Sequence, residues 1–254
     1  MKGLTSNKMK IIAIILMVLD HIGYYFVSYI SDEMFNSLRF VGRIAMPIFA
    51  FLLVQGFFNT KSRVKYIFRV FIVATICQTL IFTLGIVNNV FVKNYYIVIN
   101  TYLNILYSFA ICLAILTILE KTIIKKQVVI DRIIKIAIVI AFISIYFLID
   151  LELGLRVPIT IIGIYLAEKL YKLGNIKSEG YIIIIFTTLL IGVFTDYKYI
   201  LFNLPSILAI VPISLYNGKR GKSNKFIQWS FYLFYPIHHV ILYITALLIT
   251  HKVR

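Results

Sequence analysis

Residues 11–30 read "IIAIILMVLDHIGYYFVSYI", an apolar run interrupted near its centre by an acid and a histidine, Asp20 and His21. About 20 apolar residues in an α-helix span the roughly 30 Å hydrocarbon core of a bilayer. With a rise of about 1.5 Å per residue from Lys10, both ionisable groups lie about 15 Å deep. Placing such a group there costs about 3 kcal/mol, so it usually faces a cavity, a partner or a reaction.

The composition of the whole chain also points to the membrane. Of the 254 residues, 61% are hydrophobic and 14% are charged, and the mean hydropathy is +0.94. We therefore predict an all-α, polytopic integral membrane helical bundle that forms a single domain over residues 1–254. Apolar runs between charged breaks indicate about nine transmembrane spans, centred near Asp20, Ala50, Ile76, Phe109, Ile140, Ile164, Ile185, Ile207 and Val240. Two of them, at 157–173 and 181–195, are short and are expected to be tilted, broken or only partly inserted.

The formal net charge is +16, from 26 Lys and Arg against 10 Asp and Glu. Such an excess can indicate nucleic-acid binding, but here the basic residues gather in alternate loops, near 2–10, 61–69, 121–135, 169–177 and 219–225. By the positive-inside rule these loops and the N-terminus are cytoplasmic, and an odd number of spans places the C-terminus outside. We predict a multi-pass protein of the cell membrane whose partner is the lipid bilayer and not nucleic acid. The basic loops would also suit anionic headgroups or an anionic cytosolic ligand.

Two interpretations of Asp20 and His21 stay open. Adjacent residues on a helix point about 100° apart, so they are not placed to form an ideal pair with each other. They could hydrogen-bond to neighbouring spans and only hold helices together. Alternatively the site is catalytic: imidazole titrates near neutral pH, so His21 would act as a general base in a cavity that Asp20 helps to organise.

A second polar group lies in the next span, where Arg39 and Arg43 stand one turn apart on the same helix face. Gly42 and Pro47 would allow a close approach and a kink there. Arg39 suits an anchor at the membrane interface. The deeper Arg43 is better suited to bind an anion or a carboxylate such as Asp20.

Other polar residues lie in later segments. Asn100 and Asn104 share one end of the fourth span, in a stripe of a kind that usually mediates helix packing. Glu152 and Arg156 lie at an outer turn, which a solvated loop would explain equally well. Cys77 and Cys112 lie inside apolar runs and are interpreted as packing residues.

The last span reads "WSFYLFYPIHHVILYI" at 229–244. Pro236 removes a backbone hydrogen bond within it. Tyr235 suits a cavity lining, and His238 and His239 bring a second histidine pair to mid-span. A metal site built from His21, His238 and Asp20 is chemically conceivable, but the spacing does not specify one, and we predict no metal.

Three motifs resemble those of the TraX family of membrane proteins. They are "MKIIAIILMVLDHIG" at 9–23, "RFVGRIAMPIFAFLLVQGFFNT" at 39–60 and "FYLFYPIH" at 231–238. Segments 100–116 and 150–166 are similar to the middle of the family, so the resemblance covers most of the chain. The chain departs from the family at residues 150–152, where Asp-Leu-Glu stands in place of a frequent Asp-Tyr-Gly.

The founding member of that family N-acetylates the amino terminus of F-pilin. The resemblance therefore implies a membrane acetyltransferase that moves an acetyl group from acetyl-CoA to an amine or hydroxyl, either a peptide N-terminus or an envelope glycan. His21 would be the base, Asp20 its orienter and Arg43 an electrostatic stabiliser. The substrate-binding candidates are Arg39, Asn100, Asn104, Tyr235 and His238. Acetyl-CoA, which is large and anionic, would enter from the basic cytoplasmic side.

Two other functions remain as alternatives. Ionisable residues at mid-membrane also mark the substrate pathways of a proton-coupled transporter or permease. A structural scaffold with satisfied polar packing is the third interpretation.

Overall fold

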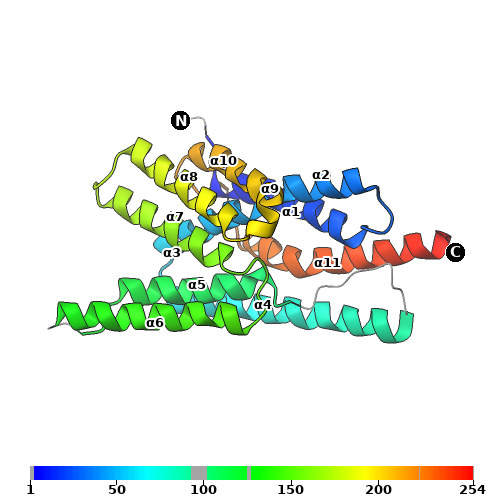
Figure 1. The fold of residues 1–254 in the computed structure, drawn as a ribbon, viewed down its shortest axis with the longest axis horizontal. Coiled ribbons are helices and arrows are strands. Elements are labelled where there is room, and N and C mark those ends of the chain that lie inside the picture. Colours follow the sequence, from blue (N-terminus) through cyan, green and yellow to red (C-terminus); the bar gives the residue numbers. More distant parts are fainter. Residues whose placement is uncertain (1–2, 93–101, 125–126, 223, 254) are drawn as a thin grey trace.

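The computed structural model describes residues 3–92, 102–124, 127–222 and 224–253, and these form a bundle of helices (Figure 1). The all-α helical bundle predicted from the sequence is thereby confirmed. The longer helices are α1 (Ser6–Tyr25), α2 (Asp32–Gly42), α3 (Ala45–Asn59), α4 (Arg63–Ile86), α5 (Ile105–Glu120), α6 (Val128–Leu148), α7 (Arg156–Lys172), α8 (Ser178–Phe194) and α11 (Lys225–Val253).

Helices α2 and α3 form one bent element that packs against α1 (Figure 1). Only Arg43 and Ile44 separate them, and both residues keep helical backbone angles. Gly42 permits the close approach to α1, because a Cβ at this position would lie 2.3 Å from the Cβ of Asp20. A small residue at a helix crossing is typical of membrane bundles.

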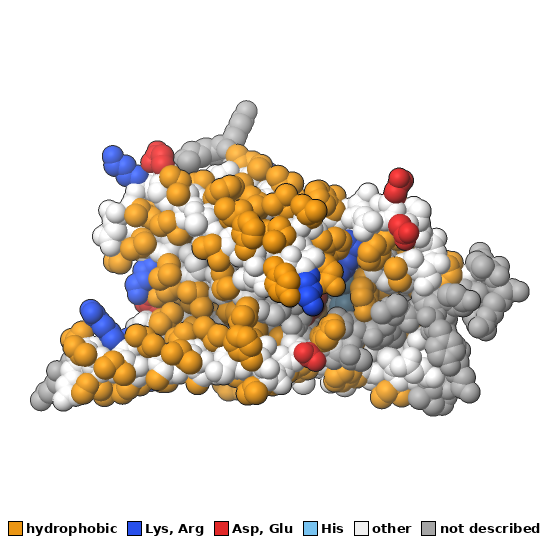
Figure 2. Space-filling model, viewed as in Figure 1, with side chains coloured by type: hydrophobic (Ala, Val, Ile, Leu, Met, Phe, Trp, Pro, Cys, Tyr) orange, Lys and Arg blue, Asp and Glu red, His pale blue; other side chains and the backbone are white. Residues whose placement is uncertain are grey.

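Helix α3 forms much of the core, whereas α4 and α6 present apolar faces outward. In the apolar 18-residue stretch of Asp32–Asn59, 67% is buried, against 28% in the corresponding stretch of Arg63–Asn89. Figure 2 shows hydrophobic side chains spread over the visible outer face. Such a surface is stable against lipid and not against water. Cys77 and Cys112 are free and buried, as predicted for packing residues.

Four segments are long and apolar enough to cross a membrane, namely Asp32–Asn59, Arg63–Asn89, Tyr197–Ser214 and Phe226–Ile249. This criterion uses length and composition only, within the part of the chain that the structure describes. The prediction of about nine spans therefore stays a prediction.

The basic loops meet at one end of the bundle. The Ser6 amide donates to the Lys219 carbonyl at 2.9 Å, which joins the first loop to the last. Glu120 joins three more, since its carboxylate lies 3.7 Å from an Arg63 nitrogen and 2.9 Å from the Lys169 Nζ. Because α1 and α11 both start at this end, the end of α11 lies far from the N-terminus (Figure 1). This is the arrangement expected for an odd number of crossings.

The break in the bundle is not where the sequence placed it. The sequence left tilting, a break or partial insertion open for the two short spans; these are the continuous helices α7 and α8, each of 17 residues, so neither is broken. The interrupted segment is instead Tyr197–Ser214, built from the 3-10 turns Tyr197–Tyr199 and Leu204–Ala209 and the short helices α9 (Ile200–Asn203) and α10 (Ile210–Ser214).

Prolines explain that interruption, because Pro205 and Pro212 each remove a backbone donor. Side chains supply hydrogen-bond donors to the Asn203 carbonyl in this segment. It accepts hydrogen bonds from Ser206 Oγ at 2.7 Å and from Arg156 Nη2 at 3.4 Å. Irregular backbone at membrane depth is stable only when its polar groups are satisfied by such neighbours.

Candidate active site

A cavity of about 860 Å³ extends through the bundle from the basic end to the level of His21. This volume falls in the range of roughly 300–1,000 Å³ typical of small-molecule sites. Basic residues line its outer part, namely Lys10, Lys61, Lys65, Arg69 and Arg220. Ionisable residues also line its inner part, namely Asp20, His21, Arg43, Glu152 and Arg156.

The carboxylate of Asp20 faces α2 and is held there by Arg39. The Arg39 Nη1 donates to the Asp20 Oδ2 at 2.5 Å, with both side chains largely buried. Gly23 leaves room for the arginine stem, since a Cβ there would lie 3.2 Å from the Arg39 Cγ. The expectation that Arg39 anchors the interface and Arg43 pairs with Asp20 is therefore wrong, because this opening places Arg39 against the acid.

Arg43 is left facing the cavity. Its guanidinium carbon lies 4.6 Å from the ring centre of Phe202, and its Nε is buried with no hydrogen-bond partner in residues 3–92, 102–124, 127–222 and 224–253. Within the described part of the chain, no carboxylate lies within ion-pair distance of it. A planar cation with unused donors at a cavity wall is suited to bind an anionic or developing negative group.

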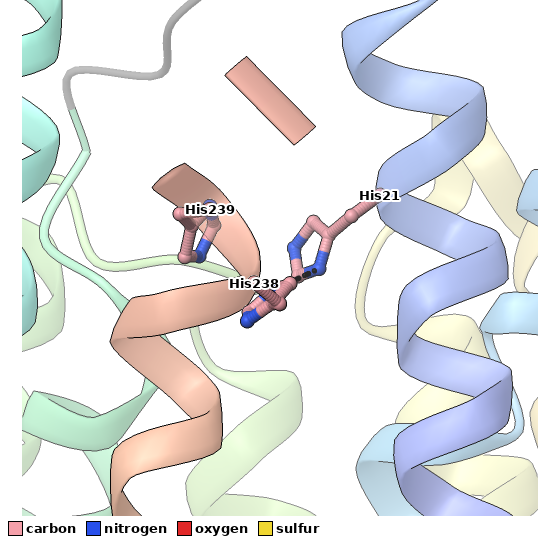
Figure 3. Close-up of side chains that lie close together, drawn as sticks. All are labelled: His21, His238 and His239. Carbon is pink, nitrogen blue, oxygen red and sulfur yellow. Dashed lines mark hydrogen bonds between the residues drawn. The ribbon is translucent and has the colours of Figure 1, made fainter. Parts of the chain in front are cut away.

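His21 faces the opposite neighbour, α11, where it meets His238 (Figure 3). The His21 Nδ1 lies 2.9 Å from the His238 Nε2, and the His238 Nδ1 lies 3.2 Å from the Phe234 carbonyl oxygen. A carbonyl only accepts, so for a neutral ring the His238 Nδ1 carries the proton and its Nε2 accepts from His21. The lone pair of His21 is then on Nε2.

This geometry corrects the role given to Asp20. The resemblance implies that Asp20 orients His21, but the hydrogen-bond partner of the His21 ring is His238. The reason is the 100° offset of adjacent helical residues, which sends Asp20 towards α2 and His21 towards α11. His238 thus contacts the candidate base and does not belong to the cavity lining. The prediction that it binds substrate would require it to line the cavity.

His239 completes a cluster of three imidazoles. Its ring centre lies 4.8 Å from that of His21 and 4.2 Å from that of His238. The His239 Nδ1 lies 3.0 Å from the Tyr25 hydroxyl, whereas its Nε2 is buried and has no hydrogen-bond partner among the residues that the structure describes. The sequence showed this histidine but gave no reason to select it, because the approach of α1 to α11 decides its contacts.

The other predicted substrate-binding residues differ in their surroundings. Tyr235 lines the cavity. Asn104 is buried and fully used: its amide nitrogen donates to the Ala74 carbonyl at 2.9 Å, and its Oδ1 caps α5 by accepting from the Leu106 amide at 3.1 Å. Its geometry supports the helix-packing interpretation and not substrate contact. Asn100 lies outside the described residues.

Glu152 and Arg156 belong to the inner wall, which the solvated-loop interpretation did not anticipate. The Glu152 Oε2 accepts from the Ile105 amide at 2.9 Å, and the Arg156 Nη1 donates to the Asn203 Oδ1 at 2.5 Å. Arg156 is only 4% exposed. One feature of the sequence could have identified Arg156. It stands directly before an apolar run, at a position where a charged residue marks the start of a membrane helix.

Comparison with known proteins gives a family and a relative. The family model described as "TraX protein" matches residues 5–246. A stretch of 74 residues is 40% identical to the "Probable fimbrial assembly protein FimC, serogroup H1" of Dichelobacter nodosus. That match covers 29% of this chain and 30% of the relative's length. No solved structure matches. Since the family model spans nearly the whole chain, including both helices that supply the histidines, the chain belongs to the TraX family.

Proposed function

We propose that the protein is a membrane-embedded acetyltransferase that moves an acetyl group from acetyl-CoA to an amine or hydroxyl acceptor. The observation that carries this proposal is the cavity, whose mouth is basic and whose inner end holds His21 and Arg43. A base and a cation at the inner end of a pocket are what acyl transfer to a weak nucleophile requires.

The donor enters through the basic end. The phosphates of CoA are the anionic groups that Lys61, Lys65 and Arg69 would attract at the mouth. The pantetheine arm is long and mostly uncharged, so it suits the apolar middle of the cavity, where Met46, Leu53 and Phe109 contribute to the wall. The thioester would then reach the level of His21.

At that level, the acceptor's nitrogen or oxygen attacks the thioester carbonyl carbon while the His21 Nε2 takes the acceptor's proton. His238 holds the other side of the ring through the 2.9 Å contact. The negative charge on the carbonyl oxygen develops beside Arg43. The intermediate collapses by breaking the carbon–sulfur bond, and the proton on His21 passes to the departing CoA thiolate. The products are the acetylated acceptor and free CoA.

The relatives favour one class of acceptor. The resemblance to pilin-acetylating proteins and the relative named as a fimbrial assembly protein both favour the N-terminal amine of a surface-fibre subunit. An envelope-glycan hydroxyl is the second acceptor, because the same base can deprotonate it.

The test is to measure binding of acetyl-CoA to the purified protein in lipid nanodiscs, followed by transfer of labelled acetyl to a pilin-like peptide. Replacing Arg69 and Lys65 by glutamine should weaken donor binding, whereas Lys198→Gln, at a residue that does not line the cavity, should leave it unchanged. A protein that binds no acetyl-CoA, or whose binding ignores the mouth variants, would contradict the proposal.

A proton-coupled permease is the second candidate. It is favoured by the interrupted segment Tyr197–Ser214, since broken helices next to ionisable side chains are common in transporters. Proteoliposomes loaded with a pH-sensitive dye separate the two functions. Proton flux driven by a solute gradient would favour the permease, and acetyl transfer without flux would favour the enzyme.

A further inference from the structure

We propose that His21, His238 and His239 form a binding site for one divalent transition-metal ion of the zinc class. One ring nitrogen of each histidine lies within 4.8 Å of the corresponding nitrogens of the other two. The close pair, His21 Nδ1 and His238 Nε2, is 2.9 Å apart. Two imidazole ligands of a tetrahedral zinc ion are roughly 3.4 Å apart, so small ring rotations bring the three nitrogens to one ion.

The unpaired nitrogen of His239 is an independent sign of a ligand. It is buried, with 6% of the residue exposed, and the described part of the chain offers its Nε2 no hydrogen-bond partner. A buried donor or acceptor in this state is rare in folded proteins and calls for an explanation such as an ion. A metal ion would satisfy it.

The outer partners of the rings also fit metal ligation. A ligand histidine usually donates the hydrogen of its other nitrogen to a carbonyl, carboxylate or similar acceptor, which fixes the ring. The His238 Nδ1 has the Phe234 carbonyl oxygen at 3.2 Å, and the His239 Nδ1 has the Tyr25 hydroxyl at 3.0 Å. Two of the three rings are therefore already held at one nitrogen by an outer partner, which leaves the other nitrogen of each ring as the candidate ligand.

The three imidazole ligands determine which metal ions the site would bind. Three imidazoles suit zinc, copper, cobalt or nickel, whereas magnesium and calcium prefer oxygen ligands. His21 is the member that also lines the cavity, so the metal site would adjoin the cavity through this ring.

The site has a regulatory consequence that rests on the proposed function. Neutral His21 has one N–H proton, and ligation through Nδ1 requires the tautomer that carries this proton on Nε2. The same ring then has no lone pair for the acceptor's proton. Metal binding and acetyl transfer through His21 therefore exclude each other, and zinc should inhibit transfer.

The experiment uses the full chain in nanodiscs, stripped with a chelator and dialysed against Zn²⁺ or Co²⁺. The wild type should retain about one metal ion per chain by elemental analysis, and Co²⁺ should give the visible absorption of a four-coordinate site. His238→Ala and His239→Ala should each weaken binding at least about tenfold.

Tyr25→Phe and His251→Ala serve as graded controls. Tyr25→Phe removes an outer partner and should weaken binding about tenfold with all three ligands kept. His251 lies twelve positions beyond His239 on α11, about 18 Å away along the helix, so His251→Ala should bind as the wild type does. Where His238→Ala does not fold, His239→Asn and the Tyr25 variant provide the comparison.

The outcomes separate this inference from the proposed function. Metal binding that depends on the cluster supports the site even where no acetyl transfer is detected. A wild type that retains no metal, or retains it equally after loss of His238 and His239, overturns the site. Metal bound at the cluster with undiminished transfer would keep the site and overturn the inhibition.

Discussion

The two sides of α1 at one depth differ in what they hold. Towards α2, the charge of Asp20 is paired with Arg39 across a crossing that Gly42 makes tight. Towards α11, three imidazoles contact one another. Both sides hold buried polar atoms that find no hydrogen-bond partner among the described residues, namely Asp20 Oδ1 and Arg39 Nε on the acidic side and His239 Nε2 on the histidine side. The acidic side pairs two opposite charges and so holds two helices together, whereas the histidine side gathers three groups that can each bind a proton or a metal ion. Neighbours in sequence therefore do not share a role, and substitutions on the two sides should change different quantities.

The largest effect is expected from His21→Ala. If the histidine side carries the chemistry, loss of the base should lower acetyl transfer by about 10²- to 10⁴-fold, while the protein stays folded and binds acetyl-CoA. Transfer of labelled acetyl, normalised to protein in nanodiscs, measures this. His251→Ala is the control, and full transfer by His21→Ala would reduce the histidine side to helix packing.

The next effect is on stability and belongs to the acidic side. Arg39→Gln leaves Asp20 buried without its partner, so the free energy of unfolding should fall by up to about 3 kcal/mol, near the low end for a buried pair because some exposure remains. Thermal unfolding in detergent measures it. Adding Asp20→Asn to Arg39→Gln should recover part of the loss. An additive double variant would show that the pair contributes nothing as a pair.

The helix crossing itself can be tested with Gly42→Ala. The new Cβ would overlap Asp20 and push α2 from α1, which should cost about 1–3 kcal/mol. Gly180→Ala is the matched control, because a Cβ there comes no closer than 3.4 Å to the nearest side chain. Equal unfolding temperatures for the two variants would mean that the crossing is not tight.

The smallest effect is expected from Arg43→Lys, and it distinguishes the role of Arg43 from that of Arg39. Arg43→Lys keeps the charge at the cavity wall but loses the planar donors, so transfer should fall about tenfold, less than the 10²- to 10³-fold loss of a whole oxyanion donor. Stability should hardly change, since Arg43 forms no ion pair among the described residues. A transfer rate equal to the wild type's, measured with the labelled peptide, would remove Arg43 from the site.

Much of the fold could be predicted because the bilayer imposes simple rules. Span length and hydropathy indicated a helical membrane bundle, and the alternation of basic loops anticipated that these loops meet at one end. The deep pair Asp20 and His21 could be selected because burying ionisable groups in hydrocarbon is costly. The interruption at Tyr197–Ser214 was missed, although Pro205 and Pro212 were visible in the sequence. Neighbouring side chains decide whether the backbone groups that a proline leaves without a helical hydrogen bond find other partners.

The sequence by itself determined which residues stand out, and the tertiary structure decided what each one meets. Asp20, His21, Arg39 and Arg43 are conspicuous in any membrane span. The choice of Arg39 as the partner of Asp20 depends on space beside Gly23, and the choice of His238 as the partner of His21 depends on the parallel packing of α1 and α11. Helical periodicity fixes the direction of a side chain relative to its own axis, but only packing fixes which neighbour lies there.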